Sequence, residues 1–211
     1  MDNFYLVGLT GQSGAGKTTV SNMFKNNGFA VINADLVSRS VTQAGTECCK
    51  ALSVHFPTCF DDNFNLDRKS LGNIVFNDKE KLKILNNTIF PFISKEIDKE
   101  IKAIVRDGEN LILLDAPTLF EADIDDKCDC IVSVVADFDI RIKRILERDG
   151  IPVELVKSRF SSQLSEQFFI SKSDYIIKNN TDIENLISDT DSIINQIKEN
   201  ANDPKESSKK S

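Results

Sequence analysis

The strongest constraint on this chain is a glycine-rich run near its amino end. The run reads Gly11-Gln12-Ser13-Gly14-Ala15-Gly16-Lys17-Thr18 and matches the pattern G-x-x-x-x-G-K-[ST] in full. Phe4 to Thr10 before it is apolar and β-favouring, and Thr18 to Asn26 after it carries apolar side chains at helical spacing. A loop of this kind between a strand and a helix directs backbone N–H groups at phosphate oxygens. The sequence therefore predicts a nucleotide phosphate site in an α/β fold.

Each residue type in this loop has an expected task. Lys17 is expected to bridge the β- and γ-phosphates of ATP, and the Thr18 hydroxyl to bind the accompanying Mg²⁺. The glycines allow the backbone to curl around the phosphates. The residues expected to bind the nucleotide are Gly11, Ser13, Gly14, Ala15, Gly16, Lys17, Thr18 and Thr19.

Four more short apolar runs follow the first strand. They are Phe29 to Asn33, Leu111 to Leu114, Cys130 to Ala136 and Tyr175 to Lys178. Helical segments separate them, which is typical of βαβ units with right-handed crossovers. We therefore expect a five-stranded parallel sheet.

The order of these elements predicts a core with two helical additions. The core comprises residues 1–35, 107–138 and 172–199, and ends in an amphipathic helix over Ile183 to Ile197. Residues 36–106 are expected to form a helical insertion that binds the acceptor, with a long helix from Lys79 to Val105 interrupted near Pro91. Residues 139–171 are expected to form a lid of two helices broken at Gly150-Ile151-Pro152, and the polar tail 200–211 to be disordered.

Composition excludes several classes of protein. The 211 residues carry a net charge of −7, which argues against a broadly basic surface for nucleic acid or anionic membranes. No stretch approaches the roughly 18–20 apolar residues of a membrane span. The single His55 excludes a His-based metal site, and five cysteines without paired C-x-x-C spacing indicate reduced thiols. We expect a cytoplasmic protein, and a monomer because no heptad pattern persists.

Two aspartates follow predicted strands at the edge that carries the loop. Asp35 is placed to accept or orient the proton of an attacking hydroxyl, as the acidic base of kinases does. Asp115 ends an apolar strand, as does the acidic residue that supports Mg²⁺ in phosphate-loop proteins. The alternative for Asp35 is a helix cap, and for Asp115 a cap or turn.

Basic residues of the predicted lid share one helix face. Arg141, Arg144 and Arg148 are spaced i, i+3 and i+7, so three guanidinium groups are expected to converge on one side. Such a face would stabilise charge on the transferred phosphoryl group. The alternative is a cationic face that is merely solvated.

Taken together, these motifs resemble the dephospho-coenzyme A kinase family over roughly residues 4–195. The match comprises the phosphate loop, Ala34-Asp35 with Arg39, Leu66-Asp67-Arg68, Asp115-Ala116-Pro117-Thr118-Leu119-Phe120-Glu121, Arg144 to Gly150, Arg159 with Gln163, and Asp174-Tyr175-Ile176-Ile177 with Asn179. The resemblance implies a nucleotide-binding core, a helical domain for the coenzyme A precursor and a mobile lid. It also implies that ATP phosphorylates the ribose 3′-hydroxyl of 3′-dephospho-CoA.

The resemblance also implies roles by position. Asp35 is the proposed base, Lys17 and Thr18 serve the phosphates and Mg²⁺, Arg148 and Arg144 act from the lid, and Asn179 lies near the adenine end. The acceptor is expected at Thr10, Asp35, Arg39, Arg68, Pro117, Leu119, Phe120 and Glu121.

Some positions depart from the family pattern. Asn33 replaces the first acid of a common D-A-D, and Phe90 stands where a His often precedes Pro91. Thr118 and Ser173 are milder changes, and Asn179-Asn180-Thr181 lacks the usual glycine.

Two other functions share the loop. A GTPase-type switch would need N-K-x-D and D-x-x-G motifs, which the chain lacks. A kinase for another small acceptor, such as a nucleoside, nucleotide or sugar, would use the same phosphate chemistry and remains the main alternative.

Overall fold

The computed structural model describes residues 4–75, 78–161 and 163–202, apart from the side chains of residues 158 and 159. The chain divides into two compact units, Met1–Val31 with Ile104–Ser211 and the intervening Ile32–Ala103. The second unit corresponds to the helical insertion that the sequence predicts over residues 36–106. No helix among the described residues is both long and apolar enough to cross a lipid bilayer.

A five-stranded sheet, which belongs to the first unit apart from the last two residues of β2, confirms the predicted α/β architecture. Its strands are β1 (Tyr5–Gly11), β2 (Ala30–Asn33), β3 (Leu111–Asp115), β4 (Cys130–Val135) and β5 (Tyr175–Lys178), in the order β2-β3-β1-β4-β5. Strand β1 pairs in parallel with β3 on one side and β4 on the other. Leu9 lies opposite Asp115 and Gly11 opposite Val134, so the loop after β1 begins beside the carboxyl ends of both neighbours.

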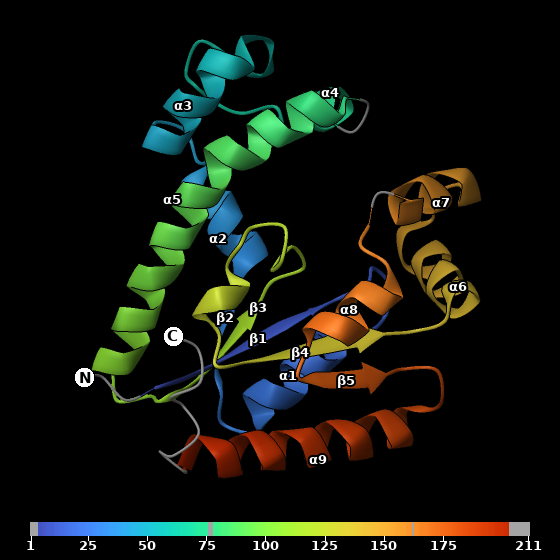
Figure 1. Ribbon diagram of the computed structural model, residues 1–211. Helices are drawn as coiled ribbons and strands as arrows, with labels where there is room; N and C mark the ends of the chain where they lie inside the picture. The colour runs from blue at the N-terminus through green and yellow to red at the C-terminus, as the bar shows by residue number, and fades with distance from the viewer. Residues whose placement is uncertain (1–3, 76–77, 162, 203–211) are drawn as a thin grey trace. The chain divides into compact units, whose positions relative to one another are not determined.

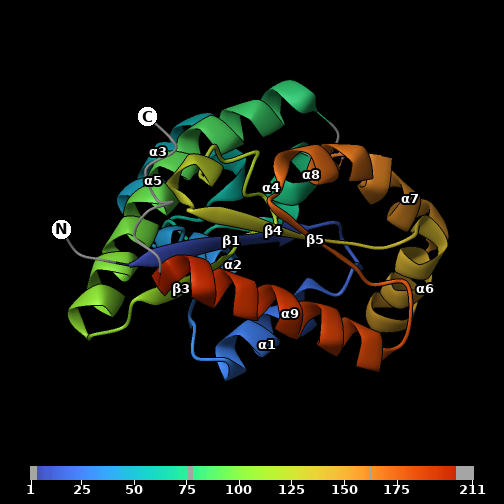
Figure 2. The same cartoon turned by 60° about the horizontal axis from the view of Figure 1, so that its bottom comes forward.

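Helices cover both faces of this sheet. Helices α1 (Lys17–Asn26) and α9 (Ile183–Asn202) lie on one face, and α8 (Glu166–Lys172) lies on the other (Figures 1 and 2). Because both faces are covered, the strands are apolar almost throughout. The core includes Val7, Leu9, Val20, Phe24, Leu113, Val132, Ile177 and Ile194. A short 3₁₀ turn, η2 (Asp125–Lys127), precedes β4, and α6 (Phe138–Asp149) and α7 (Val153–Ser161) follow it.

The second unit is helical and has its own core. It contains α2 (Ala34–Val41), α3 (Glu47–His55), η1 (Pro57–Cys59) and α4 (Arg68–Val75), together with most of α5 (Lys79–Arg106). The buried residues that pack together are Cys48, Leu52, Phe56, Cys59, Leu71 and Val75. All five cysteines of the chain are buried thiols, as expected from their spacing.

Three predictions about helices were wrong. Helix α5 continues through Pro91, which is exposed together with Asn87, so water can solvate the Asn87 carbonyl that loses its helical N–H donor. The lid segment holds a third helix, α8, because the Ser165 hydroxyl accepts a hydrogen bond from the Phe168 N–H at 3.1 Å and caps it. Helix α9 continues to Asn202, so the predicted tail begins helical, and residues 203–211 lie outside those described.

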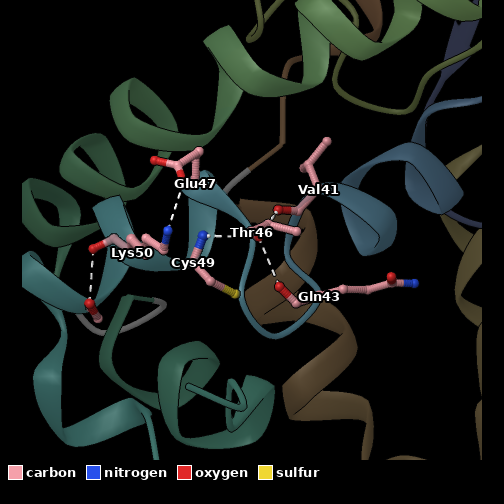
Figure 3. A network of polar contacts seen from close by, with 7 residues as sticks. Val41, Gln43, Thr46, Glu47, Cys49 and Lys50 are labelled. Atoms are coloured by element: carbon pink, nitrogen blue, oxygen red, sulfur yellow. Dashed lines mark hydrogen bonds and ion pairs between the residues drawn. The ribbon is translucent and has the colours of Figure 1, made fainter. Parts of the chain in front are cut away.

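Thr46 fastens the turn between α2 and α3. Its hydroxyl accepts a hydrogen bond from the Cys49 N–H at 3.2 Å and lies 2.7 Å from the Val41 carbonyl and 2.8 Å from that of Gln43 (Figure 3). One side chain therefore caps α3 and also holds the end of α2. The exposed Glu47–Lys50 ion pair on the same turn contributes little by comparison.

Replacing Thr46 should weaken this unit measurably. We expect Thr46→Ala to lower the free energy of unfolding by about 1–2 kcal/mol, the usual loss for a removed cap. The control is Thr88→Ala, which removes a hydroxyl bonded to the Ile84 carbonyl of the preceding turn of α5 and should change the free energy of unfolding by close to zero. Urea unfolding of both variants measures the difference, and equal losses would contradict the capping role.

Candidate nucleotide site

The loop between β1 and α1 has the backbone that a phosphate site needs. Gly11 has φ +144°, and a Cβ atom there would lie 2.2 Å from the Val134 carbonyl oxygen of β4. Only glycine allows the loop to leave the sheet so close to its neighbour. Helix α1 begins at Lys17, so its N-terminal N–H groups and dipole face the loop.

The ammonium group of Lys17 forms an ion pair with Asp115 at the end of β3. The two side chains are 17% and 6% exposed, so the pair is largely removed from water. The arrangement brings together the lysine predicted to bind phosphate and the carboxylate predicted to support a metal. Thr18 and Thr19 follow on the exposed surface of α1.

The three lid arginines do not converge on one site, contrary to expectation. Arg141 is buried, its Nε–H donates to the Ala136 carbonyl at 2.9 Å, and its guanidinium carbon lies 4.2 Å from the centroid of the Phe160 ring. This burial lowers the pKa of Arg141. The helical spacing was correct, but burial of Arg141 against its own hairpin removes it from the shared face.

The other two arginines have separate partners. Arg144 contacts the phosphate loop and Asn179, which follows β5. Arg148 is exposed and donates two hydrogen bonds to the adjacent Asp149 carboxylate, which raises the pKa of Arg148. The side chain of Arg159 lies outside those described.

The predicted acceptor turn after β3 is only partly on the surface. Thr10 and Leu119 are fully buried, so both support the turn from beneath and neither presents its side chain to a ligand. The Thr10 hydroxyl lies 3.3 Å from the Pro117 carbonyl that it bonds, and Leu119 packs over Gly8. Glu121 as a whole is exposed to solvent. Its carboxyl group is surrounded by protein atoms, and this desolvation raises the pKa of Glu121.

Two contacts around the turn and the loop were not predicted. The half-buried Phe120 ring meets Phe168 of α8 edge-on, with ring centroids 5.2 Å apart. The side-chain carbonyl of Gln163 accepts a hydrogen bond from the Ser13 N–H at 3.4 Å. The only sequence signal for the aromatic contact was the pair Phe168-Phe169, but two adjacent aromatic residues are common in protein cores and do not indicate which residue they contact.

The remaining predicted residues belong to the second unit. Asp35 is exposed in the first turn of α2, where Asn33 and not Asp35 is the cap, accepting from the Leu36 N–H at 3.0 Å. The capping alternative for Asp35 is therefore wrong, and Asn33 performs that task without a carboxylate. The exposed Arg68 donates from Nη2 to the buried Thr42 hydroxyl at 2.5 Å and to the Arg39 carbonyl at 3.4 Å.

Comparisons with known proteins identify the family of this chain. A family model described as dephospho-CoA kinase matches residues 5–185. A dephospho-CoA kinase of Fusobacterium nucleatum subsp. nucleatum is 38% identical over 181 residues, 86% of this chain and 92% of that protein. The solved structure of a dephospho-CoA kinase from Campylobacter jejuni has a TM-score of 0.67 at 25% identity and covers 92% of this chain and 98% of its own. The solved structure of TT1252 from Thermus thermophilus shares the fold, with a TM-score of 0.80 at 24% identity over 92% of this chain and 97% of its own.

The different environments of Arg141 and Arg148 predict different costs of removal. We expect Arg141→Ala to lower the free energy of unfolding by about 2–4 kcal/mol, because a buried hydrogen bond and a desolvated cation–π contact are lost. Arg148→Ala should change it by no more than about 0.5 kcal/mol, since its ion pair is exposed. Urea unfolding in one buffer measures both variants. Similar losses of unfolding free energy would show that the buried contacts of Arg141 do not stabilise the fold.

Proposed function

Because the chain belongs to the dephospho-CoA kinase family, we propose that it transfers the γ-phosphoryl group of ATP to the ribose 3′-hydroxyl of 3′-dephospho-CoA. The products are CoA and ADP, and the reaction is the final step of coenzyme A synthesis. The observation that carries the proposal is the phosphate loop at the head of α1, with Lys17 held beside Asp115. The family membership selects the acceptor.

The phosphate loop supplies most of the catalytic electrostatics. Phosphoryl transfer requires little covalent chemistry from the protein, so positioning and charge stabilisation dominate. The loop N–H groups and the amino end of α1 bind the phosphates, and Lys17 exchanges Asp115 for the β- and γ-phosphates. Since Lys17 is already largely buried, this exchange requires little further desolvation of its ammonium group.

Thr18 and Asp115 have the donor types that suit Mg²⁺. A hydroxyl and a carboxylate, completed by phosphate oxygens and water, form the oxygen set that this ion prefers. Within the described residues no group of three or more His, Cys, Asp or Glu side chains gathers as a metal site, so the nucleotide would complete the coordination. Bound Mg²⁺ would supply neutralisation of the phosphate charge.

The proposal also assigns residues to the acceptor and to the transferred group. Asp35 accepts the proton of the 3′-hydroxyl, which suits an exposed carboxylate that is not used as a cap. Arg39, Arg68, Pro117, Phe120 and Glu121 bind the acceptor, and the buried Leu119 supports the turn that carries the last three. Arg148 of the lid stabilises charge on the transferred group after leaving Asp149.

The proposed enzyme acts as a cytoplasmic monomer. The five buried thiols support a reducing compartment. Its partners are ATP and 3′-dephospho-CoA, without nucleic acid or membrane.

An acceptor comparison tests this function. ADP release with Mg²⁺ and ATP is measured with 3′-dephospho-CoA, adenosine, AMP, shikimate and gluconate in turn. We expect turnover only with 3′-dephospho-CoA and a product with the mass of CoA. Turnover confined to another acceptor would leave the phosphate site intact but contradict the proposed substrate.

The proposed base predicts a loss of rate without a loss of nucleotide binding. Asp35→Asn should lower the single-turnover rate by about 10²- to 10⁴-fold, because the amide cannot accept the hydroxyl proton. The affinity for ATP should stay unchanged. Asp62→Asn, which alters an exposed carboxylate of the same unit, is the control and should keep the wild-type rate. A nearly full rate in Asp35→Asn would remove Asp35 from the mechanism.

A further inference from the structure

Asn179 lies directly against the phosphate loop. Its side-chain Nδ2 donates a hydrogen bond to the Ala15 carbonyl at 2.8 Å, and its own backbone N–H is held by the Val135 carbonyl at 2.9 Å. The residue is only 7% exposed. The first residue after β5 is thus anchored to β4, and its side chain reaches the loop that follows β1.

Arg144 of helix α6 donates hydrogen bonds to the same residue. Its guanidinium group donates to the Asn179 backbone carbonyl at 3.1 Å and to the Asn179 side-chain oxygen at 3.2 Å. A longer contact of 3.5 Å reaches the Ala15 carbonyl itself. Arg144 therefore orients the Asn179 amide more than it touches the loop.

The loop leaves no space between itself and this amide. Gly16 has φ +101°, and a Cβ atom there would lie 2.3 Å from Asn179 Nδ2. The second glycine of the motif is thus required by the Asn179 amide as well as by its backbone conformation. Any shift of the amide would be transmitted to the Ala15–Gly16 peptide.

The orientation of that peptide matters for anion binding. A trans peptide holds its C=O and N–H in opposite directions. With the Ala15 carbonyl tied to Asn179, the Gly16 N–H must point to the other side of the peptide. We place the anion on that side, because a phosphate loop binds anions through its backbone N–H groups.

We propose that Asn179 and Arg144 are positioning residues for the phosphate loop, acting on the triphosphate through the Ala15–Gly16 peptide and not on the nucleobase. This inference rests on the proposed nucleotide site but not on the identity of the acceptor. It differs from a place for Asn179 at the adenine end, because the buried amide has its oxygen bonded to Arg144 and a donor bonded to Ala15. In this proposal Arg144 orients Asn179 before the nucleotide binds.

Inorganic tripolyphosphate, which has no base, distinguishes the two roles. With Mg²⁺ present, we expect Asn179→Ala to weaken binding of tripolyphosphate and of ATP by the same factor, roughly tenfold. The ratio of ATP to GTP affinity should stay as in the wild type. In turnover, KM for ATP should rise while KM for the acceptor is unchanged. Weaker ATP binding with unchanged tripolyphosphate binding, or a changed ATP to GTP ratio, would overturn the proposal.

Asn180→Ala is the matched control for the neighbouring position. Asn180 exchanges two hydrogen bonds with Asp137, at 2.7 and 2.8 Å, which hold its side chain at the amino end of α6 and not at the phosphate loop. Its affinity for tripolyphosphate should equal that of the wild type. A loss equal to that of Asn179→Ala would show that the effect is a general disturbance after β5 and would overturn the specific role.

Arg144→Ala alone tests the proposal where Asn179→Ala does not fold, and a double-mutant cycle tests whether Arg144 acts through Asn179. Arg144 is half-buried, and Arg144→Ala alone should weaken tripolyphosphate binding by several-fold. In the Asn179→Ala background it should add little, because Arg144 acts through Asn179. Full additivity, or unchanged binding in Arg144→Ala, would overturn its positioning role. Neither result depends on whether the protein phosphorylates 3′-dephospho-CoA.

Discussion

The pairing of β1 between β3 and β4 decides where the chemistry of this molecule takes place. Parallel hydrogen bonding on both sides brings the carboxyl ends of three strands to one edge, with Gly11 opposite Val134 and Leu9 opposite Asp115. A slip of one residue would turn the apolar side chains of β1 to the wrong faces, so the register is firmly specified. The start of the phosphate loop, the carboxylate beside it and the first turn of α1 are fixed by the same set of strand contacts.

The cations that we expect to meet the phosphates already have partners, in a chain whose net charge is −7. Lys17 is bound to Asp115, Arg144 to the backbone and side chain of Asn179, and Arg148 to Asp149. Each cation is thus oriented by its own chain. A triphosphate would exchange with the carboxylates at Lys17 and Arg148, but it would leave the Arg144 contacts in place, which is why we assign Arg144 to positioning. Arg141 belongs to the packing of the α6–α7 hairpin.

The sheet and the loop could be predicted because short apolar runs and a complete glycine motif are local signals. The five strands and the helix after the loop were found within one or two residues. The helix α8 and the continuity of α5 through Pro91 were missed, since a single serine cap and the hydration of one carbonyl are weak signals. Periodicity placed three arginines on one helix face, but it does not say that Phe160 covers the first of them. The contacts of Asn179 join residues 164 positions apart, and no local pattern indicates them. The roles of Asp35, Arg39 and Arg68 stay predictions.

The central claim is that a phosphoryl group is transferred to a sugar hydroxyl. The fate of the label from γ-³²P-ATP tests this claim most directly. The protein is incubated with Mg²⁺, the labelled nucleotide and 3′-dephospho-CoA, and the labelled product is separated and its phosphate position determined by ³¹P NMR on an unlabelled preparation. We expect the label to appear in CoA as a 3′-phosphate, with little labelled inorganic phosphate. Label released mainly as inorganic phosphate, or attached at another position of the acceptor, would contradict it.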